Sequence, residues 1–183
     1  MNPAGVTRKR EDVETTSFLL LLSVMEYTAH YPSPLGDITL ASDGTALTGL
    51  WFDGQRHFGS TLGDEYEECP VLPVFEETCR WLNTYFSGLV PDFVPQVALR
   101  GTPFRLAVWQ ELMNIPYGYT ITYGDIARRL GCRSAQAIGT AVGHNPISII
   151  IPCHRVLPAN GALGGYAGGS SRKQRLLELE QNM

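Results

Sequence analysis

The sequence predicts an α/β protein built from two lobes, a small β-rich lobe followed by a mostly helical one. Three observations indicate this class. Polar and apolar residues alternate around Ile38 to Leu40, which is typical of a half-buried strand. Apolar residues then recur with helical spacing over residues 74–87. Further along, residues that start helices occur in close succession at Thr102, Thr122 and Ser134.

The chain ahead of the first lobe is interpreted as a disordered extension, residues 1–24, that precedes a start near Met25. The apolar run from Phe18 to Val24 follows the basic residues 8–10, a pattern that faintly resembles a secretion signal. Acidic residues separate the two features and no small-residue cleavage site follows, so a cytoplasmic protein is expected. No apolar run approaches the roughly 20 residues that span a bilayer, which predicts no membrane partner.

The first lobe is expected to cover residues 25–95. Asp43-Gly44 favours a hairpin turn, after which Ala46 to Phe52 supplies the returning strand. The acidic stretch 64–68 is expected to be a solvated loop, and the Pro-rich stretch 91–95 to connect the lobes. The helix over 74–87 would bury the face formed by Phe75, Thr78, Cys79, Leu82, Tyr85 and Phe86.

The second lobe, residues 96–183, is expected to be mostly helical. Thr102 and Pro103 are a cap and a first-turn proline for its first helix. Two short helices follow, capped by Thr122 with Asp125 and by Ser134, and joined by a short turn that contains glycine. This is the helix-turn-helix pattern, although ordinary packed helices give it too. The three helices would bury Phe104, Val108 and Leu112, then Ile126, Ala127 and Leu130, then Ile138, Ala141 and Val142.

The outer face of the second short helix is uncharged and consists mostly of small residues, Gln136, Gly139, Thr140 and Gly143. A glycine inside a helix costs about 1 kcal/mol relative to alanine, so close packing or close approach of a ligand should compensate. The ligand could be a nucleic-acid backbone or the minor groove, which is only about 6 Å wide. Nearby arginines could contact phosphates or form an ordinary solvated face: Arg128, Arg129 and Arg133.

The charge is distributed unevenly along the chain. Residues 1–100 hold 6 Lys/Arg and 14 Asp/Glu, whereas residues 101–183 hold 8 and 4, so the halves carry −8 and +4. The second half could therefore meet phosphates although the net charge is −4. The four cysteines form no C-x-x-C pair and suggest neither a metal site nor a disulfide framework, so reduced thiols are expected.

Cys153 is the candidate nucleophile. It follows the apolar run 147–151, which is expected to be a buried strand that would fix the thiol on rigid scaffold near the surface. His154 is adjacent and could supply the positive charge that favours a reactive thiolate, or remove the thiol proton through a bridging water. The imidazole then needs an orienting acceptor, for which Glu178 and Glu180 on the last helical segment are both candidates.

A glycine-rich segment, 161–169, carries Tyr166 downstream of this thiol. Dense glycine permits tight turns and a close approach of the backbone to a ligand. The spacing matches no phosphate-binding P-loop. A wall of a pocket for a flat ligand is the more consistent interpretation.

These residues resemble the methylated-DNA–protein-cysteine methyltransferases, also called O6-alkylguanine-DNA alkyltransferases. The resemblance runs from about Tyr27 to Glu180 and is strongest from Thr102 to Gly169. It rests on several motifs in order: Gly101-Thr102-Pro103-Phe104, Ile115-Pro116-Tyr117-Gly118, Tyr123-Gly124-Asp125-Ile126-Ala127, Gly143-His144-Asn145-Pro146, Ile151-Pro152-Cys153-His154-Arg155-Val156 and Gly165-Tyr166-Ala167-Gly168-Gly169. It implies a ribonuclease-H-like first lobe and a DNA-binding second lobe.

The resemblance also implies a reaction. Cys153 would take the alkyl group of O6-methylguanine, or of O4-methylthymine, from double-stranded DNA after the base has rotated out of the stack. His154 and a water would activate the thiol, Glu180 would orient the imidazole, and Asn145 would hold the turn. Tyr123 would donate a proton or hydrogen bond to the leaving guanine. The alkylated protein would be spent after one turnover, as a monomer without cofactor or metal.

Further residues follow from the same resemblance. Gln136 stands where many members insert an arginine into the stack, and Ala167 where some have a serine. The other expected contacts with the base or with DNA, whose minor groove the second short helix would enter, are Gly139, Arg128, Arg133, Val156 and Tyr166. Two alternatives are a lesion-binding protein without activity, whose members lack the cysteine, and a cysteine hydrolase, for which no oxyanion hole is evident.

Overall fold

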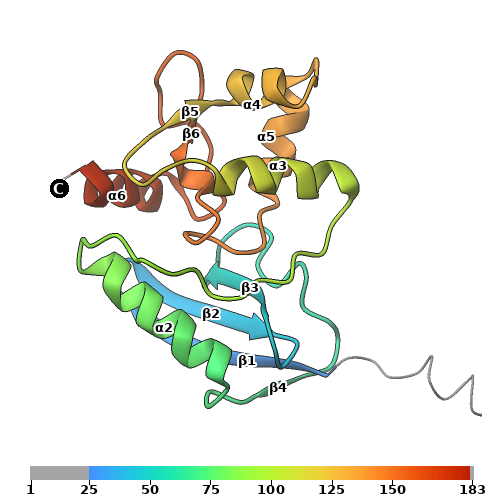
Figure 1. Ribbon diagram of the computed structural model, residues 1–183, viewed down its shortest axis with the longest axis vertical. Coiled ribbons are helices and arrows are strands. Elements are labelled where there is room, and N and C mark those ends of the chain that lie inside the picture. The colour runs from blue at the N-terminus through green and yellow to red at the C-terminus, as the bar shows by residue number, and fades with distance from the viewer. Residues whose placement is uncertain (1–24, 182–183) are drawn as a thin grey trace, which may run out of the picture.

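The computed structural model describes residues 25–181, so the predicted extension 1–24 lies outside the described residues. It confirms a mixed α/β fold, with a sheet and the helix α2 in one lobe and the remaining helices in the other (Figure 1). The two lobes lie against each other along one side of the sheet lobe. Within residues 25–181, no helix is long and apolar enough to cross a membrane.

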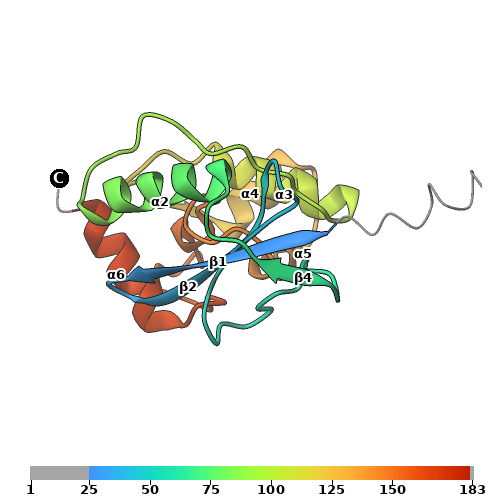
Figure 2. The same cartoon turned by 90° about the horizontal axis from the view of Figure 1, so that it is seen from below.

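The first lobe is built on a sheet with the order β3-β2-β1-β4. β1 (Glu26–Ser33), β2 (Gly36–Ser42) and β3 (Leu47–Phe52) form an antiparallel meander. The predicted hairpin turn is confirmed at Gly44, whose φ of 95° suits glycine, and Asp43 Oδ1 accepts the N–H of Ala46 at 2.9 Å. Figure 2 shows β1, β2 and β4 side by side, with α2 lying along the sheet.

The acidic stretch 64–68 is not entirely a loop, contrary to the prediction. Its last residues form β4 (Tyr66–Glu68), which pairs in parallel with β1. Every side chain of β4 is exposed, so its sequence has none of the alternation that reveals a strand. The free edge of β1 supplies hydrogen-bonding partners that composition alone does not indicate.

The helix α2 (Pro73–Phe86) begins and ends within a residue of the predicted range. It ends before Gly88, whose φ is 83°. Cys79 and Phe86 are only partly buried, whereas Trp81 is buried although it was not predicted to be. The side chains that the helix buries are Val74, Phe75, Thr78, Trp81, Leu82 and Tyr85.

The second lobe contains α3 (Pro103–Met113), α4 (Tyr123–Arg129), α5 (Ala135–Gly143) and α6 (Ser170–Gln181). A two-stranded ladder pairs β5 (Ile121–Thr122) with β6 (Val156–Leu157). The prediction for Phe104 is wrong, since this side chain is 39% exposed. Trp109 lies inside instead, and its indole N–H donates to the carbonyl of Ala141 at 2.9 Å, which ties α3 to α5.

The predicted pair of short helices is present as α4 and α5, connected by residues 130–134. Thr122 and Asp125 form the predicted capping box, and the Ser134 side chain accepts the N–H of Ala137. Gly131 in the connection has a φ of 61°. Leu130 is only partly buried, whereas the predicted inner residues of α5 are buried.

The apolar run 147–151 is buried as predicted but does not form a strand. It turns sharply: Ile149 has a φ of 69°, and the N–H of Ile151 bonds back to the carbonyl of Ile147 at 3.1 Å. A short apolar run cannot distinguish a strand from a buried turn, because both exclude polar side chains. The turn contacts β3 through Leu50, whose carbonyl accepts the N–H of Ser148 at 2.8 Å, and so joins the lobes.

Candidate active site

Cys153 begins a short 3-10 helix, η1 (Cys153–Arg155), directly after the buried turn. Its side chain is 4% exposed and lines a cavity of about 670 Å³. A cavity of this size suits a small organic ligand. The other described cysteines are partly exposed and do not line this cavity. The thiol singled out in the sequence is therefore the one that a bound ligand would reach.

Asn145 holds both the turn and the sulfur. Its side-chain carbonyl accepts the N–H of Ile147 at 3.0 Å, and its amide nitrogen lies 2.8 Å from the carbonyl of Ile151. The same nitrogen lies 3.1 Å from Cys153 Sγ and donates to it. Asn145 is buried, so these contacts fix the thiol in one position.

His154 is fully buried and is oriented by Glu180, the carboxylate that the family resemblance implies. His154 Nε2 lies 2.7 Å from Glu180 Oε1, whereas the side chain of Glu178 is 42% exposed and interacts with Gln174 and Arg175. A carboxylate only accepts hydrogen bonds, so Nε2 carries the hydrogen. Nδ1 is buried and bonds to no described residue, which leaves its lone pair free to accept a proton.

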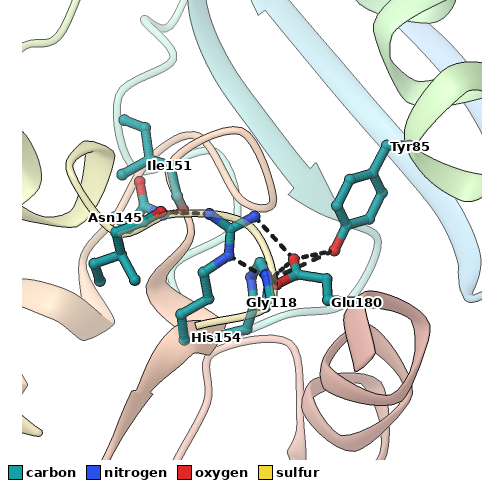
Figure 3. A network of polar contacts seen from close by, with 8 residues as sticks. Tyr85, Gly118, Asn145, Ile151, His154 and Glu180 are labelled. Atoms are coloured by element: carbon teal, nitrogen blue, oxygen red, sulfur yellow. Dashed lines mark hydrogen bonds and ion pairs between the residues drawn. The ribbon is translucent and has the colours of Figure 1, made fainter. Parts of the chain in front are cut away.

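Glu180 is the centre of a network that draws on both lobes (Figure 3). Arg155 contacts both carboxylate oxygens, with Nε 2.8 Å from Oε2 and Nη2 3.0 Å from Oε1. The hydroxyl of Tyr85, on α2 of the first lobe, donates to Oε1 at 2.7 Å, and the N–H of Gly118 donates to Oε2 at 3.2 Å. Sequence reasoning did not find Tyr85 or Arg155 as members of this network.

Of the two predicted ways to activate the thiol, the pKa shifts do not favour a thiolate at rest. Burial raises the pKa of Cys153, and this effect outweighs the hydrogen bond from Asn145. Burial also lowers the pKa of His154 despite its bond to Glu180. Burial opposes ionisation of Glu180 as well, but the hydrogen bonds from His154 and Arg155, together with the charge of Arg155, prevail and lower its pKa to about 2. The resting site thus holds a neutral thiol, a neutral imidazole and a carboxylate.

Lys173 on α6 is a second group that the sequence did not reveal. Its side chain is fully buried, and Nζ donates to the carbonyl of Val156 at 2.7 Å. Burial lowers its pKa to about 8, while the nearby Cys153 opposes that change. A buried cation beside this sulfur would stabilise a thiolate once one forms.

The cavity has three walls, which are built from segments that lie far apart in the sequence. The predicted outer face of α5 forms one wall, and Tyr123 with the segment 158–167 forms another. Burial and the proximity of Cys153 raise the pKa of Tyr123. The third wall belongs to the first lobe and was not predicted. The lining residues include Gln136, Gly139, Thr140, Gly143, Tyr123, Tyr166, Ala167, Arg56 and His57.

Three predicted contacts do not line the cavity. Val156 is buried in β6, and only its backbone takes part, as the acceptor for Lys173. Arg128 is exposed and paired with Asp125 at 3.0 Å, and Arg133 is exposed in the connection between α4 and α5. Among residues 25–181, no group of three or more His, Cys, Asp or Glu side chains could hold a metal ion.

Comparison with known proteins gives matches for both lobes. Residues 27–97 match the ribonuclease-like domain of 6-O-methylguanine DNA methyltransferase, and residues 103–182 match its DNA-binding domain. The methylated-DNA–protein-cysteine methyltransferase of Mycobacterium bovis is 45% identical over 151 residues, 82% of this chain and 89% of the relative. The Haemophilus influenzae protein of that name is 40% identical over 158 residues, 85% of this chain and 86% of the relative.

Solved structures agree. The crystal structure of Mycobacterium tuberculosis OGT in complex with DNA has a TM-score of 0.77 and 44% identity, covering 86% of this chain and 93% of that one. An O6-methylguanine DNA methyltransferase from Methanococcus jannaschii has a TM-score of 0.63 and 28% identity, covering 85% and 94%. The chain therefore belongs to the family of the methylated-DNA–protein-cysteine methyltransferases.

Proposed function

We propose that this protein repairs DNA by moving the alkyl group of O6-alkylguanine onto the sulfur of Cys153. The observation that carries the proposal is the position of this thiol, which lines a cavity of about 670 Å³ and is held by Asn145. A bond forms between Sγ and the alkyl carbon, and the bond from that carbon to O6 breaks. The resulting thioether is stable, so each molecule acts once.

The protons move along the network around His154. The neutral thiol gives its proton to a water, which passes one to the free Nδ1 of His154, so the thiolate forms only as the ligand reacts. Glu180 stabilises the imidazolium through Nε2, in the way a triad carboxylate does. Tyr123, which lines the cavity, donates its proton to the guanine as O6 leaves.

The base reaches the sulfur by leaving the duplex, because a thiol at the bottom of a cavity cannot contact O6 inside a base stack. The small face of α5 enters the minor groove, and Gln136 fills the space that the base vacates. Glutamine can hydrogen-bond the orphaned cytosine but brings no charge. The complex of the Mycobacterium tuberculosis relative with DNA supports DNA as the partner.

Mass spectrometry tests this proposal directly. After incubation with duplex DNA that contains O6-methylguanine, the intact protein should gain one methyl group, located on the peptide that contains Cys153. Cys153→Ala should gain none and still bind the duplex. A methyl group on Cys69, Cys79 or Cys132, or no gain at all, would refute the assignment.

A further inference from the structure

A short segment of the first lobe, residues 55–57, contacts the second lobe beside the cavity. Gln55 is buried, and its side-chain carbonyl accepts the N–H of Phe52 at 3.0 Å and the hydroxyl of Ser148 at 3.2 Å. The N–H of Arg56 donates to the carbonyl of Ala167 at 3.0 Å. These contacts place Arg56 and His57 in the cavity wall.

His57 is held in an unusual conformation against a second histidine. Its φ is 61°, in the left-handed region that non-glycine residues rarely adopt. Its ring stacks on His144, which follows the last turn of α5, with centroids 3.9 Å apart and planes inclined by 26°. His144 Nδ1 lies 2.7 Å from the carbonyl of Thr140 and must donate to it. His144 Nε2 is therefore the ring nitrogen that this hydrogen bond leaves for another partner.

The surroundings of this histidine pair are positive. Burial lowers the pKa of His57, and the charges of His144, Arg56 and Arg105 lower it further. Arg105 belongs to the first turn of α3, so the four groups come from three separate parts of the chain. In the described part of the chain Arg56 and Arg105 have no ion-pair partner, whereas Arg128, Arg129 and Arg155 each pair with a carboxylate. Arg56, His57 and His144 line the cavity, and uncompensated positive charge beside a cavity favours an anionic ligand.

We propose that Arg56, His57 and His144 form a binding site for a backbone phosphate of the DNA strand that carries the damaged base. The inference rests on the proposed function and extends it, since it gives the first lobe a direct part in binding DNA. A nucleotide that enters the cavity brings its phosphates to the rim. The guanidinium group and the imidazole N–H groups there would neutralise one of them.

The salt dependence of DNA affinity tests the site. Each neutralised phosphate contributes about 0.9 to the slope of log affinity against log salt concentration. For Arg56→Gln we expect about three- to tenfold weaker binding of duplex that contains O6-methylguanine at low salt, and a slope smaller by about 1. The matched control is Arg80→Gln, the same change on α2, where Arg80 contacts the ring of Phe93 away from the cavity.

A second arm measures the dependence of affinity on pH. A phosphate beside His57 favours its protonated form, so binding should strengthen as the pH falls from about 8 to about 6. At the same salt concentration, the DNA affinity of the His57→Gln variant should depend less on pH. The charged and titratable groups that bear on His57 are Arg56, Arg105 and His144. The affinity of the double variant with His144→Gln should depend on pH even less, because it removes the second imidazole of the pair.

The outcomes separate this proposal from the proposed function. Equal salt slopes for Arg56→Gln, Arg80→Gln and the unaltered protein would overturn the phosphate site, even where methyl transfer proceeds. A smaller slope for Arg56→Gln alone supports the site, even where Cys153 gains no methyl group.

Discussion

At the scale of single residues, Glu180 is the side chain on which the site depends most. It receives hydrogen bonds from Tyr85, Gly118, His154 and Arg155, and it is buried. For Glu180→Gln we expect a loss of about 3 kcal/mol in unfolding free energy, because the change leaves the buried Arg155 without its counter-charge. Methyl transfer should slow by at least about 100-fold, since the imidazole loses its carboxylate. Urea unfolding and single-turnover kinetics measure the two effects.

The same carboxylate gives stability a defined dependence on pH. Its pKa in the folded protein, about 2, lies below the ordinary 4.5, so its contribution is complete above pH 4.5 and is lost as the pH falls towards 2. The loss of stability between pH 4.5 and pH 2 should be smaller in Glu180→Gln. Glu178→Gln is the control, because this exposed carboxylate should change neither stability nor rate appreciably. Similar losses for the two variants would contradict the central role of Glu180.

The choice between these carboxylates also marks how far the sequence could predict the site. Cys153 and His154 were identifiable because the two residues are adjacent, and Asn145 and Tyr123 because they stand in recognisable motifs. Residue types alone left Glu178 and Glu180 open, the family resemblance implied Glu180, and the packing of α6 turns Glu180 inward. Tyr85 lies 95 residues from its partner Glu180, a separation over which no local pattern carries information.

At the scale of helices and turns, capping chemistry was predictable and the buried turn was not. Thr102, Thr122 and Ser134 cap helices as predicted, because each side chain bonds to a backbone N–H three residues further on. The turn over residues 147–151 depends instead on Asn145 and on contacts with β3, a strand of the other lobe. The apolar composition of this turn indicates only that it is buried. A buried strand was predicted there because strands of that length have the same composition.

The glycines of α5 give a prediction at this scale. A Cβ at Gly139 would meet Tyr123 at 3.8 Å, an ordinary contact, so packing within the protein does not require glycine there. Gly139→Ala should therefore raise the unfolding free energy by about 1 kcal/mol. It should also weaken binding of duplex DNA, because the added methyl group projects into the cavity.

Ala137→Gly separates stability from binding. Ala137 is on the same helix but does not line the cavity, so this change should cost about 1 kcal/mol of stability and leave duplex affinity unaltered. Urea unfolding and duplex titrations of both variants provide the comparison. The interpretation of the small face as a ligand surface fails where Gly139→Ala destabilises the protein, or where it binds duplex DNA as tightly as the unaltered protein.

At the scale of the whole molecule, the two lobes share one active site. The second lobe supplies Cys153, His154 and Glu180, while α2 of the first lobe reaches across to donate a hydrogen bond from Tyr85 (Figure 3). The segment 55–57 crosses the same boundary at the cavity. The sequence predicted both lobes, but it could not predict that the sheet lobe completes the site, because these contacts join residues far apart in the chain.

Tyr85→Phe tests this sharing of the site. The change removes one donor from Glu180 and leaves the ring, which stacks on Trp81, in place. We expect a loss of about 1 kcal/mol in stability and a roughly three- to tenfold slower methyl transfer, since the carboxylate is less firmly held. Tyr31→Phe is the matched control: its hydroxyl donates to Asn83 at 2.9 Å within the first lobe, so its loss should lower stability similarly without slowing transfer. Equal transfer rates for both variants would mean that the first lobe supports the site only by packing.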